Sequence, residues 1–264
     1  MHPKLITIGS FYLPTYGVML AFAYLFAIWL LTRKADREGL PKNEISDLSI
    51  AILAAAILGA KALLAIVDMK EYIADPRTAM ELIRSGGVFQ GGLIAATIVG
   101  VWYIRKHRLP VWRVTDMAAP SIAIGEAIGR FGCLAAGCCY GKPTHVPWAI
   151  TFRNPFAHEA VGTPLNVALH PTQIYLSLNA FALFLICEWS YRHKKFDGEV
   201  FWIYVLGYAL TRGVIEEFRG DLVRGFVVPG VLSTAQFIGI LMALVSIVML
   251  FVLRRRGALA EQRA

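Results

Sequence analysis

Residues 232–253 read LSTAQFIGILMALVSIVMLFVL, a stretch of 22 residues that contains no charged side chain. A helix needs about 20 mostly apolar residues to cross the roughly 30 Å hydrocarbon core of a lipid bilayer. A second stretch, SDLSIAILAAAILGAKALLAI at residues 46–66, is almost as apolar and holds only Asp47 and Lys61 as charges. Stretches of this length and composition predict a chain whose helices lie in a membrane rather than in water.

Similar stretches occur throughout the 264 residues. We expect membrane-spanning helices near residues 13–31, 46–66, 91–104, 116–136, 171–190, 199–216 and 232–253. The composition agrees, because 57% of the residues are hydrophobic and only 17% are charged, far from the average of soluble proteins. The sequence therefore predicts an all-α fold: a polytopic membrane protein with about seven transmembrane helices, in a single domain that covers residues 1–264.

The N-terminal segment lacks the pattern of a cleavable signal peptide. Its first apolar run begins near Ser10, is interrupted by Pro14, and is not followed by a small-residue cleavage site. We therefore expect the first spanning helix to remain in the mature protein.

The net charge of +8 comes from basic residues in short clusters between the apolar stretches, which argues against the single basic patch of a nucleic-acid-binding protein. Of the 26 Lys and Arg residues, 15 lie in one set of loops and 8 in the opposite set. Because Lys and Arg concentrate in cytoplasmic loops, we expect the N-terminus outside and the C-terminus in the cytoplasm. The two longest outer connections, near residues 67–90 and 137–170, are expected to rest on the membrane interface.

Two arginines inside predicted spans each have an acidic partner at helical spacing. An unpartnered charge at a helix centre costs about 2.5 to 3.5 kcal/mol on insertion scales. Glu126 precedes Arg130 by four residues, Glu216 follows Arg212 by four, and Arg219 comes three residues later on the same predicted face. Each pair alone is compatible with a structural ion pair. Two pairs favour a common buried polar site, because a guanidinium group holds phosphate or carboxylate oxygens in a bidentate way.

Three further polar segments lie at the predicted helix starts. Residues 86–92 read GGVFQGG, and they are either a flexible helix entry or a set of backbone N–H groups facing an anion. His170 opens the fifth span, where a lone histidine is more often an interface residue than a catalyst. Ser233 and Gln236 open the seventh span, and ordinary interhelical hydrogen bonding is the favoured interpretation.

Taken in order, these pieces resemble the prolipoprotein diacylglyceryl transferase family, and the chain looks like a divergent member. The resemblance runs through most of the chain. Its matching pieces are Tyr16-Gly17, Gly59 with Lys61, residues 86–92, Gly129-Arg130-Phe131-Gly132, His170 through Tyr175, Gly207-Tyr208 through Arg212, Glu216 and Arg219, and Ser233 with Gln236.

The resemblance implies a reaction in the bacterial cytoplasmic (inner) membrane. A diacylglyceryl group would pass from phosphatidylglycerol to the lipobox cysteine thiol of a prolipoprotein, with no cofactor, no metal and no nucleic acid. Its partners would be phosphatidylglycerol and the signal-peptide segment that holds the lipobox. By the resemblance, the catalytic residues are Arg130, Arg212, Glu216 and His170. The substrate-binding residues are Tyr16, Lys61, Gln90, Gly91, Gly92, Arg219 and Gln236.

The sequence departs from the family pattern at the glycine run and after the Gly-Arg motif. The family usually has a histidine, often proposed as the base, where this chain has Gln90. A glutamine side chain cannot accept a proton at physiological pH, so His170 is the substitute base that we would test. The family also usually has arginine at the position of Lys61, and asparagine where this chain continues into a cysteine-rich segment.

That segment contains Cys133, Cys138 and Cys139, and three interpretations stay open. The thiols are small apolar packing groups, or they pair with each other or bind a metal, or one of them takes up the diacylglyceryl group transiently. Arg130 lies three residues before Cys133 and would lower the pKa of a neighbouring thiol. Adjacent cysteines are poorly placed to hold one zinc ion together.

Two functional alternatives also stay open. The chain is either a paralogue that transfers diacylglyceryl to another acceptor, or a non-catalytic membrane protein that binds or transports phospholipids. Transfer of labelled diacylglycerol separates these alternatives, since a binder shows affinity for phosphatidylglycerol without turnover.

Overall fold

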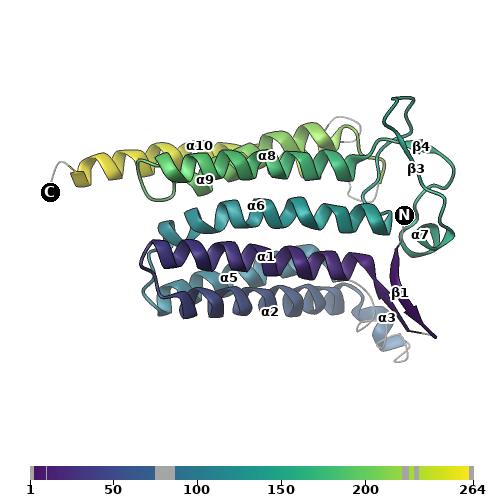
Figure 1. The fold of residues 1–264 in the computed structure, drawn as a ribbon, viewed down its shortest axis with the longest axis horizontal. Coiled ribbons are helices and arrows are strands. Elements are labelled where there is room, and N and C mark those ends of the chain that lie inside the picture. The colour runs from purple at the N-terminus through teal and green to yellow at the C-terminus, as the bar shows by residue number, and fades with distance from the viewer. Residues whose placement is uncertain (1–2, 10, 75–86, 222–225, 229–231, 262–264) are drawn as a thin grey trace. The chain divides into compact units, whose positions relative to one another are not determined.

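The computed structural model describes residues 3–9, 11–74, 87–221, 226–228 and 232–261. Most of these residues are helical (Figure 1). In chain order the elements are β1 (Lys4–Ile8), β2 (Phe11–Pro14), α1 (Thr15–Arg37), α2 (Lys42–Val67), α3 (Met69–Ala74), α5 (Phe89–Lys106), α6 (Val111–Ala136), β3 (Ile150–Thr151), α7 (Pro155–Val161), β4 (Ala168–Leu169), α8 (Thr172–His193), α9 (Glu199–Glu216), β5 (Phe226–Val228), β6 (Leu232–Ser233) and α10 (Thr234–Glu261).

Each predicted span coincides with one long helix, in order α1, α2, α5, α6, α8, α9 and α10. Four of these helices, α1, α2, α8 and α10, are long and apolar enough to cross a membrane. The prediction of a helical membrane protein is thereby confirmed. For the helices α5, α6 and α9, the crossing of the bilayer stays a prediction.

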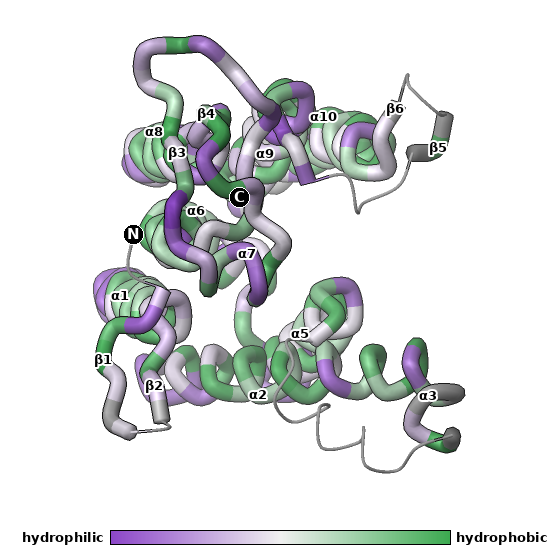
Figure 2. The backbone as a smooth tube through the Cα atoms, turned by 90° about the vertical axis from the view of Figure 1, so that its right-hand side faces the viewer, coloured by the Kyte–Doolittle hydropathy of each residue, from purple (hydrophilic) through white to green (hydrophobic). Residues whose placement is uncertain are grey.

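The long helices are rich in hydrophobic residues, as the colours of Figure 2 show. Many of their large apolar side chains are exposed. Leu58 on α2 is 68% exposed and Leu178 on α8 is 63% exposed. Contiguous apolar surface of this kind is unfavourable in water and is ordinary on helices that face lipid chains.

The chain forms two compact units, one of residues 1–30 with 115–264 and the other of residues 31–114. We call them the large unit and the small unit, and each is described by itself.

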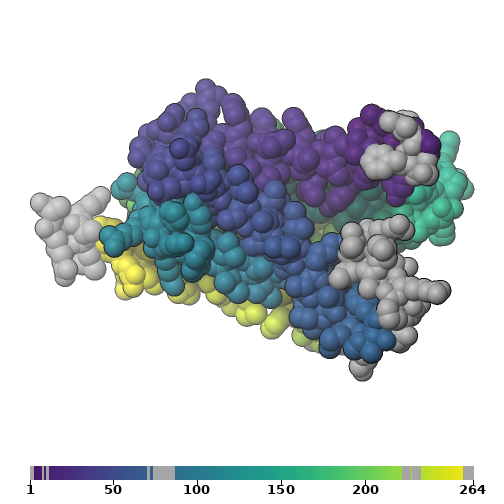
Figure 3. Space-filling model, turned by 90° about the horizontal axis from the view of Figure 1, so that it is seen from below, coloured from purple at the N-terminus to yellow at the C-terminus, as the bar shows by residue number. Residues whose placement is uncertain are grey.

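The small unit is built on close packing between α2 and α5, drawn with all atoms in Figure 3. A Cβ atom added to Gly59 would lie 2.5 Å from the carbonyl oxygen of Gly91, and one added to Gly91 would lie still closer to that of Gly59, so neither position has room for a side chain. The N–H group of Val88 donates a 3.0 Å hydrogen bond to the carbonyl oxygen of Ala60, which fixes the start of α5 against α2. Small residues at such crossings let helix backbones approach closely in membranes.

In the large unit, a buried carboxylate on α6 holds the start of α9. Asp116 is fully buried and accepts hydrogen bonds from the N–H groups of Gly198 at 2.8 Å and Phe201 at 3.0 Å. These groups belong to the first turn of α9, which has no intrahelical partners for them. Further along α6, the carbonyl oxygen of Ala127 accepts a 2.8 Å hydrogen bond from Ser177 on α8.

Short strands and the small helix α7 gather at one end of the large unit, at the right of Figure 1. The pairs β1–β2 and β3–β4 are antiparallel, and Tyr12 of β2 packs edge-on against Phe156 of α7 with ring centroids 5.5 Å apart. None of these strands was predicted from the sequence. The first span was expected to start near residue 13, whereas α1 begins at Thr15, after the β1–β2 hairpin ends at Pro14.

Candidate active site

The large unit contains both predicted Arg–Glu pairs. Arg130 donates a 2.7 Å hydrogen bond from Nη2 to Oε1 of Glu126 on α6. On α9, Nη1 of Arg212 donates to Oε2 of Glu216. The four-residue spacing therefore pairs the side chains as the sequence predicts, and it leaves each guanidinium group with further donors.

Arg212 is only 8% exposed, and its Nη2 is buried with no hydrogen-bond partner within the described part of the chain. A buried N–H donor without a partner costs about 1 to 3 kcal/mol, and more when the group is charged. An anion that binds here would satisfy this donor and neutralise the charge.

Arg219 lies beyond the C-terminus of α9, so it does not continue the helical face of Arg212 and Glu216. Its side chain pairs with Asp221, with Nε 2.8 Å from Oδ1 and Nη2 2.5 Å from Oδ2. The main chain here runs beside the segment that follows α6, because Lys142 N–H donates to the carbonyl oxygen of Phe218 at 2.8 Å. This places the charge of Arg219 next to the cysteine-rich segment.

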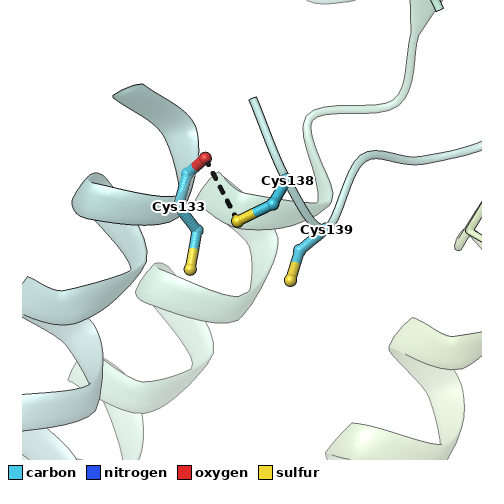
Figure 4. Close-up of side chains that lie close together, drawn as sticks. All are labelled: Cys133, Cys138 and Cys139. Carbon is cyan, nitrogen blue, oxygen red and sulfur yellow. Dashed lines mark hydrogen bonds between the residues drawn. The ribbon is translucent and has the colours of Figure 1, made fainter. Parts of the chain in front are cut away.

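The three cysteines converge where α6 ends. Cys133 lies on α6, and the chain then turns at Gly137, with φ +86°, so that Cys138 and Cys139 return towards the helix. The three Sγ atoms lie within 4.8 Å of one another, and Cys138 Sγ donates a weak 3.8 Å hydrogen bond to the carbonyl oxygen of Cys133 (Figure 4). No disulfide joins them.

The start of α8 holds this turn in place. Thr172 Oγ1 donates a 2.6 Å hydrogen bond to the carbonyl oxygen of Cys139, and Gln173 Nε2 donates a 2.7 Å bond to that of Cys138. Both side chains are fully buried. Cys139 itself has φ +59°, a left-handed conformation that is uncommon for residues other than glycine.

The thiols of this turn have unequal acidity. Hydrogen bonds from the thiols of Cys133 and Cys138, together with the charge of Arg219, hold the pKa of Cys139 below its ordinary value, although burial acts in the opposite direction. The pKa of Cys138 is raised by its hydrogen bonds to the other two sulfur atoms and by burial. The charge of Arg219 thus favours the thiolate form of Cys139 over that of Cys138.

Tyr16, at the start of α1, contacts the same region. A Cβ atom added to Gly132 would lie 3.3 Å from both the carbonyl oxygen and Cδ2 of Tyr16, so the tyrosine packs directly on α6. Tyr16 interacts electrostatically with Arg130 and with the three cysteine thiols. The large unit thus brings together the predicted residues Tyr16, Arg130, Arg219 and the cysteines.

His170 lies in an aromatic cluster. Its Nδ1 is 3.2 Å from the hydroxyl oxygen of Tyr175, which also accepts a 2.7 Å hydrogen bond from Trp148 Nε1. The ring of Phe218 packs edge-on against the imidazole at 5.2 Å. The imidazole is therefore held by its Nδ1 edge.

Gln236 takes part in a helix cap that the sequence analysis missed. Its Oε1 accepts from the N–H group of Ser233 at 3.0 Å, and its own N–H group donates to Ser233 Oγ at 3.1 Å. This reciprocal pair is a capping box at the start of α10, and the spacing Ser-x-x-Gln was the available signal. Gln236 Nε2 also donates to Glu217 just beyond α9. Its role in substrate binding stays a prediction.

The small unit carries the remaining predicted residues. Lys61 is half-buried on α2, Gln90 is exposed in the first turn of α5, and Gly91 and Gly92 are buried against α2. Gly86 lies outside the described residues. The glycines serve helix packing, a role that the sequence analysis did not assign, although the spacing of Gly87, Gly91 and Ala95 was a sign of it. Anion binding by this segment stays a prediction.

Comparisons with known proteins agree with the expected family. The family model described as prolipoprotein diacylglyceryl transferase matches residues 3–252. The phosphatidylglycerol–prolipoprotein diacylglyceryl transferase of Clostridium tetani is 37% identical over 248 residues, covering 94% of this chain and 96% of that protein. The Vibrio cholerae protein of the same name is 30% identical over 266 residues, covering 99% and 95%. The Synechococcus elongatus protein of that name is 30% identical over 225 residues, covering 83% and 77%. The resemblance seen in the sequence is confirmed, and the chain belongs to the prolipoprotein diacylglyceryl transferase family.

Proposed function

We propose that this protein transfers a diacylglyceryl group from phosphatidylglycerol to the lipobox cysteine thiol of prolipoproteins. The printed names of its relatives state this activity for those proteins. The observation that carries the proposal is Arg212, whose buried Nη2 lacks a hydrogen-bond partner within the described residues. Such an N–H group suits a phosphate oxygen, both in phosphatidylglycerol and in the departing glycerol phosphate.

The reaction builds negative charge on the departing phosphate. The lipobox sulfur forms a bond with the sn-3 carbon of the diacylglyceryl unit, the bond from that carbon to the phosphate oxygen breaks, and glycerol phosphate leaves with the electron pair. Arg212, oriented by Glu216, and Arg130, oriented by Glu126, are the proposed donors to this charge. Fixed donors in a buried environment stabilise developing charge far better than water does.

The attacking thiol must lose its proton, because the thiolate is the nucleophile. His170 is the proposed base. A hydroxyl oxygen accepts two hydrogen bonds, so Tyr175 can accept from His170 Nδ1 as well as from Trp148. In that arrangement Nε2 is the unprotonated nitrogen and is able to take up the thiol proton.

The remaining assignments concern substrate binding and topology. Substrate contacts are proposed for Tyr16, Lys61, Gln90, Gly91, Gly92, Arg219 and Gln236. We also propose that all seven long helices cross the bacterial cytoplasmic membrane, with the N-terminus outside and the C-terminus in the cytoplasm. The connection near residues 137–170 would then rest on the outer interface, in line with the distribution of Lys and Arg. Of the connection near residues 67–90, residues 75–86 lie outside the described residues.

The test is transfer of radiolabelled diacylglycerol from phosphatidylglycerol to a lipobox peptide by the purified protein in detergent. We expect robust transfer by the unchanged protein and a loss of about 100-fold or more in Arg212→Gln. Arg255→Gln is the matched control, because Arg255 is an exposed arginine near the end of α10 and should be dispensable.

Two outcomes would contradict the proposal. Binding of phosphatidylglycerol without any transfer would favour a lipid-binding or transport protein. Transfer to a different thiol or hydroxyl acceptor, with the lipobox peptide left unmodified, would favour a paralogue with another acceptor.

A further inference from the structure

A metal ion in a protein is often held by three or more cysteine, histidine or acidic side chains. Among the described residues, one such group has ligand atoms close enough to share an ion, and it consists of the thiols of Cys133, Cys138 and Cys139. We propose that these three sulfur atoms bind a single thiophilic metal ion of the Cu⁺ or Zn²⁺ class. The proposal does not rest on the transferase reaction, and nothing in that reaction requires a metal.

The spacing of the sulfur atoms suits such an ion. Metal–sulfur bonds of about 2.3 Å place ligand sulfurs roughly 3.8 to 4.0 Å apart in tetrahedral or trigonal geometry. The three Sγ atoms already lie within 4.8 Å of one another. Closing the remaining gap needs shifts of less than about 1 Å, which small rotations of the side chains supply. Three sulfurs complete a trigonal Cu⁺ site, whereas Zn²⁺ would take a fourth ligand such as water.

The backbone conformation explains how adjacent cysteines can act together. In an extended chain, the side chains of Cys138 and Cys139 would point to opposite sides. The left-handed φ of +59° at Cys139 changes this direction, and both sulfurs lie within 4.8 Å of the Cys133 sulfur at the end of α6 (Figure 4). A residue in this conformation costs about 1 to 3 kcal/mol unless its surroundings enforce it, and such conformations gather at functional sites.

Those surroundings are rigid on both sides of the turn. Thr172 and Gln173 fix the two carbonyl oxygens from α8, and Thr163 Oγ1 donates a 3.0 Å hydrogen bond to the carbonyl oxygen of Gly137. The backbone of the turn is thus held before any ion arrives, which lowers the entropy lost on binding. Cys138 and Cys139 are only partly buried, so an ion has access to them.

Two arginines interact with the thiols that such a complex would use. Three thiolates with Zn²⁺ carry a net charge of about −1, and with Cu⁺ about −2, by the charges of the ligands and ions. Arg219 interacts with Cys139 and Arg130 interacts with Cys133. Each arginine also pairs with a carboxylate, Asp221 and Glu126 respectively, so it offsets the negative charge of the complex only in part. Binding replaces the thiol protons by the ion, and these protons pass to solvent.

The experiment uses the full-length protein, purified under reducing conditions and freed of metal. Cu⁺ and Zn²⁺ are each supplied from a competing coloured chelator, which gives stoichiometry and affinity. We expect about one ion per chain, and at least about tenfold weaker binding in Cys133→Ala, Cys138→Ala and Cys139→Ala. Cys187→Ala is the matched control, since Cys187 is buried on α8 in a cluster with Ala119 and Val200 and should leave binding unchanged.

X-ray absorption of the loaded protein provides a readout that does not depend on variants. Three sulfur atoms at about 2.2 to 2.3 Å from the bound ion would support the site. The total number of coordinating atoms separates the two ions, since Cu⁺ would have three and Zn²⁺ a fourth. The proposal is overturned if the unchanged protein binds neither ion, or if the three variants bind the ions as well as Cys187→Ala does. It is also overturned if mass spectrometry finds two of the three thiols joined in a disulfide even when metal ion is supplied. Diacylglyceryl transfer measured on the same samples reports separately on the proposed function.

Discussion

Thr172 Oγ1 donates a 2.6 Å hydrogen bond to the carbonyl oxygen of Cys139, a residue 33 positions earlier in the chain. This bond ties the start of α8 to the cysteine turn and holds the left-handed conformation of Cys139. It also satisfies a carbonyl group that would otherwise be left without a partner where α8 packs on the turn. The shape of the turn therefore depends on a residue that does not belong to it.

Thr172→Val is expected to loosen the cysteine turn. It keeps the shape of the side chain but removes the donor, which should lower the free energy of unfolding by about 1 to 3 kcal/mol and speed the alkylation of Cys138 and Cys139. Thermal unfolding and thiol labelling followed by mass spectrometry measure both effects. Thr97→Val is the control, because Thr97 Oγ1 donates to the carbonyl oxygen of Leu93 within its own helix. Equal effects in the two variants would show that the bond from Thr172 has no special role.

Asp116→Ala is expected to destabilise the large unit strongly. The change leaves the N–H groups of Gly198 and Phe201 without their acceptor and removes the partner of Lys194, 3.4 Å away. Loss of one partner from a buried charged network typically costs about 3 to 5 kcal/mol. Asp197→Ala removes the more exposed carboxylate that also pairs with Lys194, and it should cost less than about 1 kcal/mol. Unfolding in a denaturing detergent titration compares the stability of the two variants. A similar loss of stability in both would contradict the role of Asp116 in holding the start of α9.

Gly59→Ala is expected to separate α2 from α5. The added methyl group would lie 2.5 Å from the carbonyl oxygen of Gly91, so the helices must move apart at a cost of about 1 to 3 kcal/mol. Gly129→Ala is the matched control on α6, where the added carbon has no neighbour within 4 Å among the described residues, apart from the helix's own nearby backbone. That change should be neutral or stabilise the helix by up to about 1 kcal/mol. A loss of stability in Gly129→Ala as large as in Gly59→Ala would argue against this explanation.

The positions of the long helices could be predicted from the sequence because each apolar stretch carries its own signal. Every predicted span coincides with a helix, and the i,i+4 spacing correctly paired Arg130 with Glu126 and Arg212 with Glu216. These relationships are local, and helical periodicity alone determines them.

What the sequence did not reveal depends on contacts between distant segments. The convergence of the cysteines requires the left-handed Cys139 and its hydrogen bond from Thr172, which no local pattern encodes. The β1–β2 hairpin is stabilised partly by packing of Tyr12 on Phe156, far along the chain. The capping box of Ser233 and Gln236 is the exception, since its local pattern was present in the sequence. The interhelical bonding predicted for this pair is confirmed for Gln236, whose Nε2 donates a 3.5 Å hydrogen bond to the carbonyl oxygen of Gly213 on α9.

His170→Asn is expected to slow transfer by about 100-fold to 10,000-fold if the imidazole is the base, because asparagine can still donate a hydrogen bond but cannot accept the thiol proton. His145→Asn is the control, since His145 is an exposed histidine in the same connection between α6 and α8. Single-turnover transfer to a lipobox peptide measures the rate. A second peptide with selenocysteine in place of the acceptor cysteine separates catalysis from structure, because a selenol is already ionised at neutral pH and needs no base. The variant should therefore recover most of its rate with the selenol peptide. If thiol and selenol peptides are slowed to the same extent, His170 supports the aromatic cluster with Tyr175 and Phe218, and another group removes the proton.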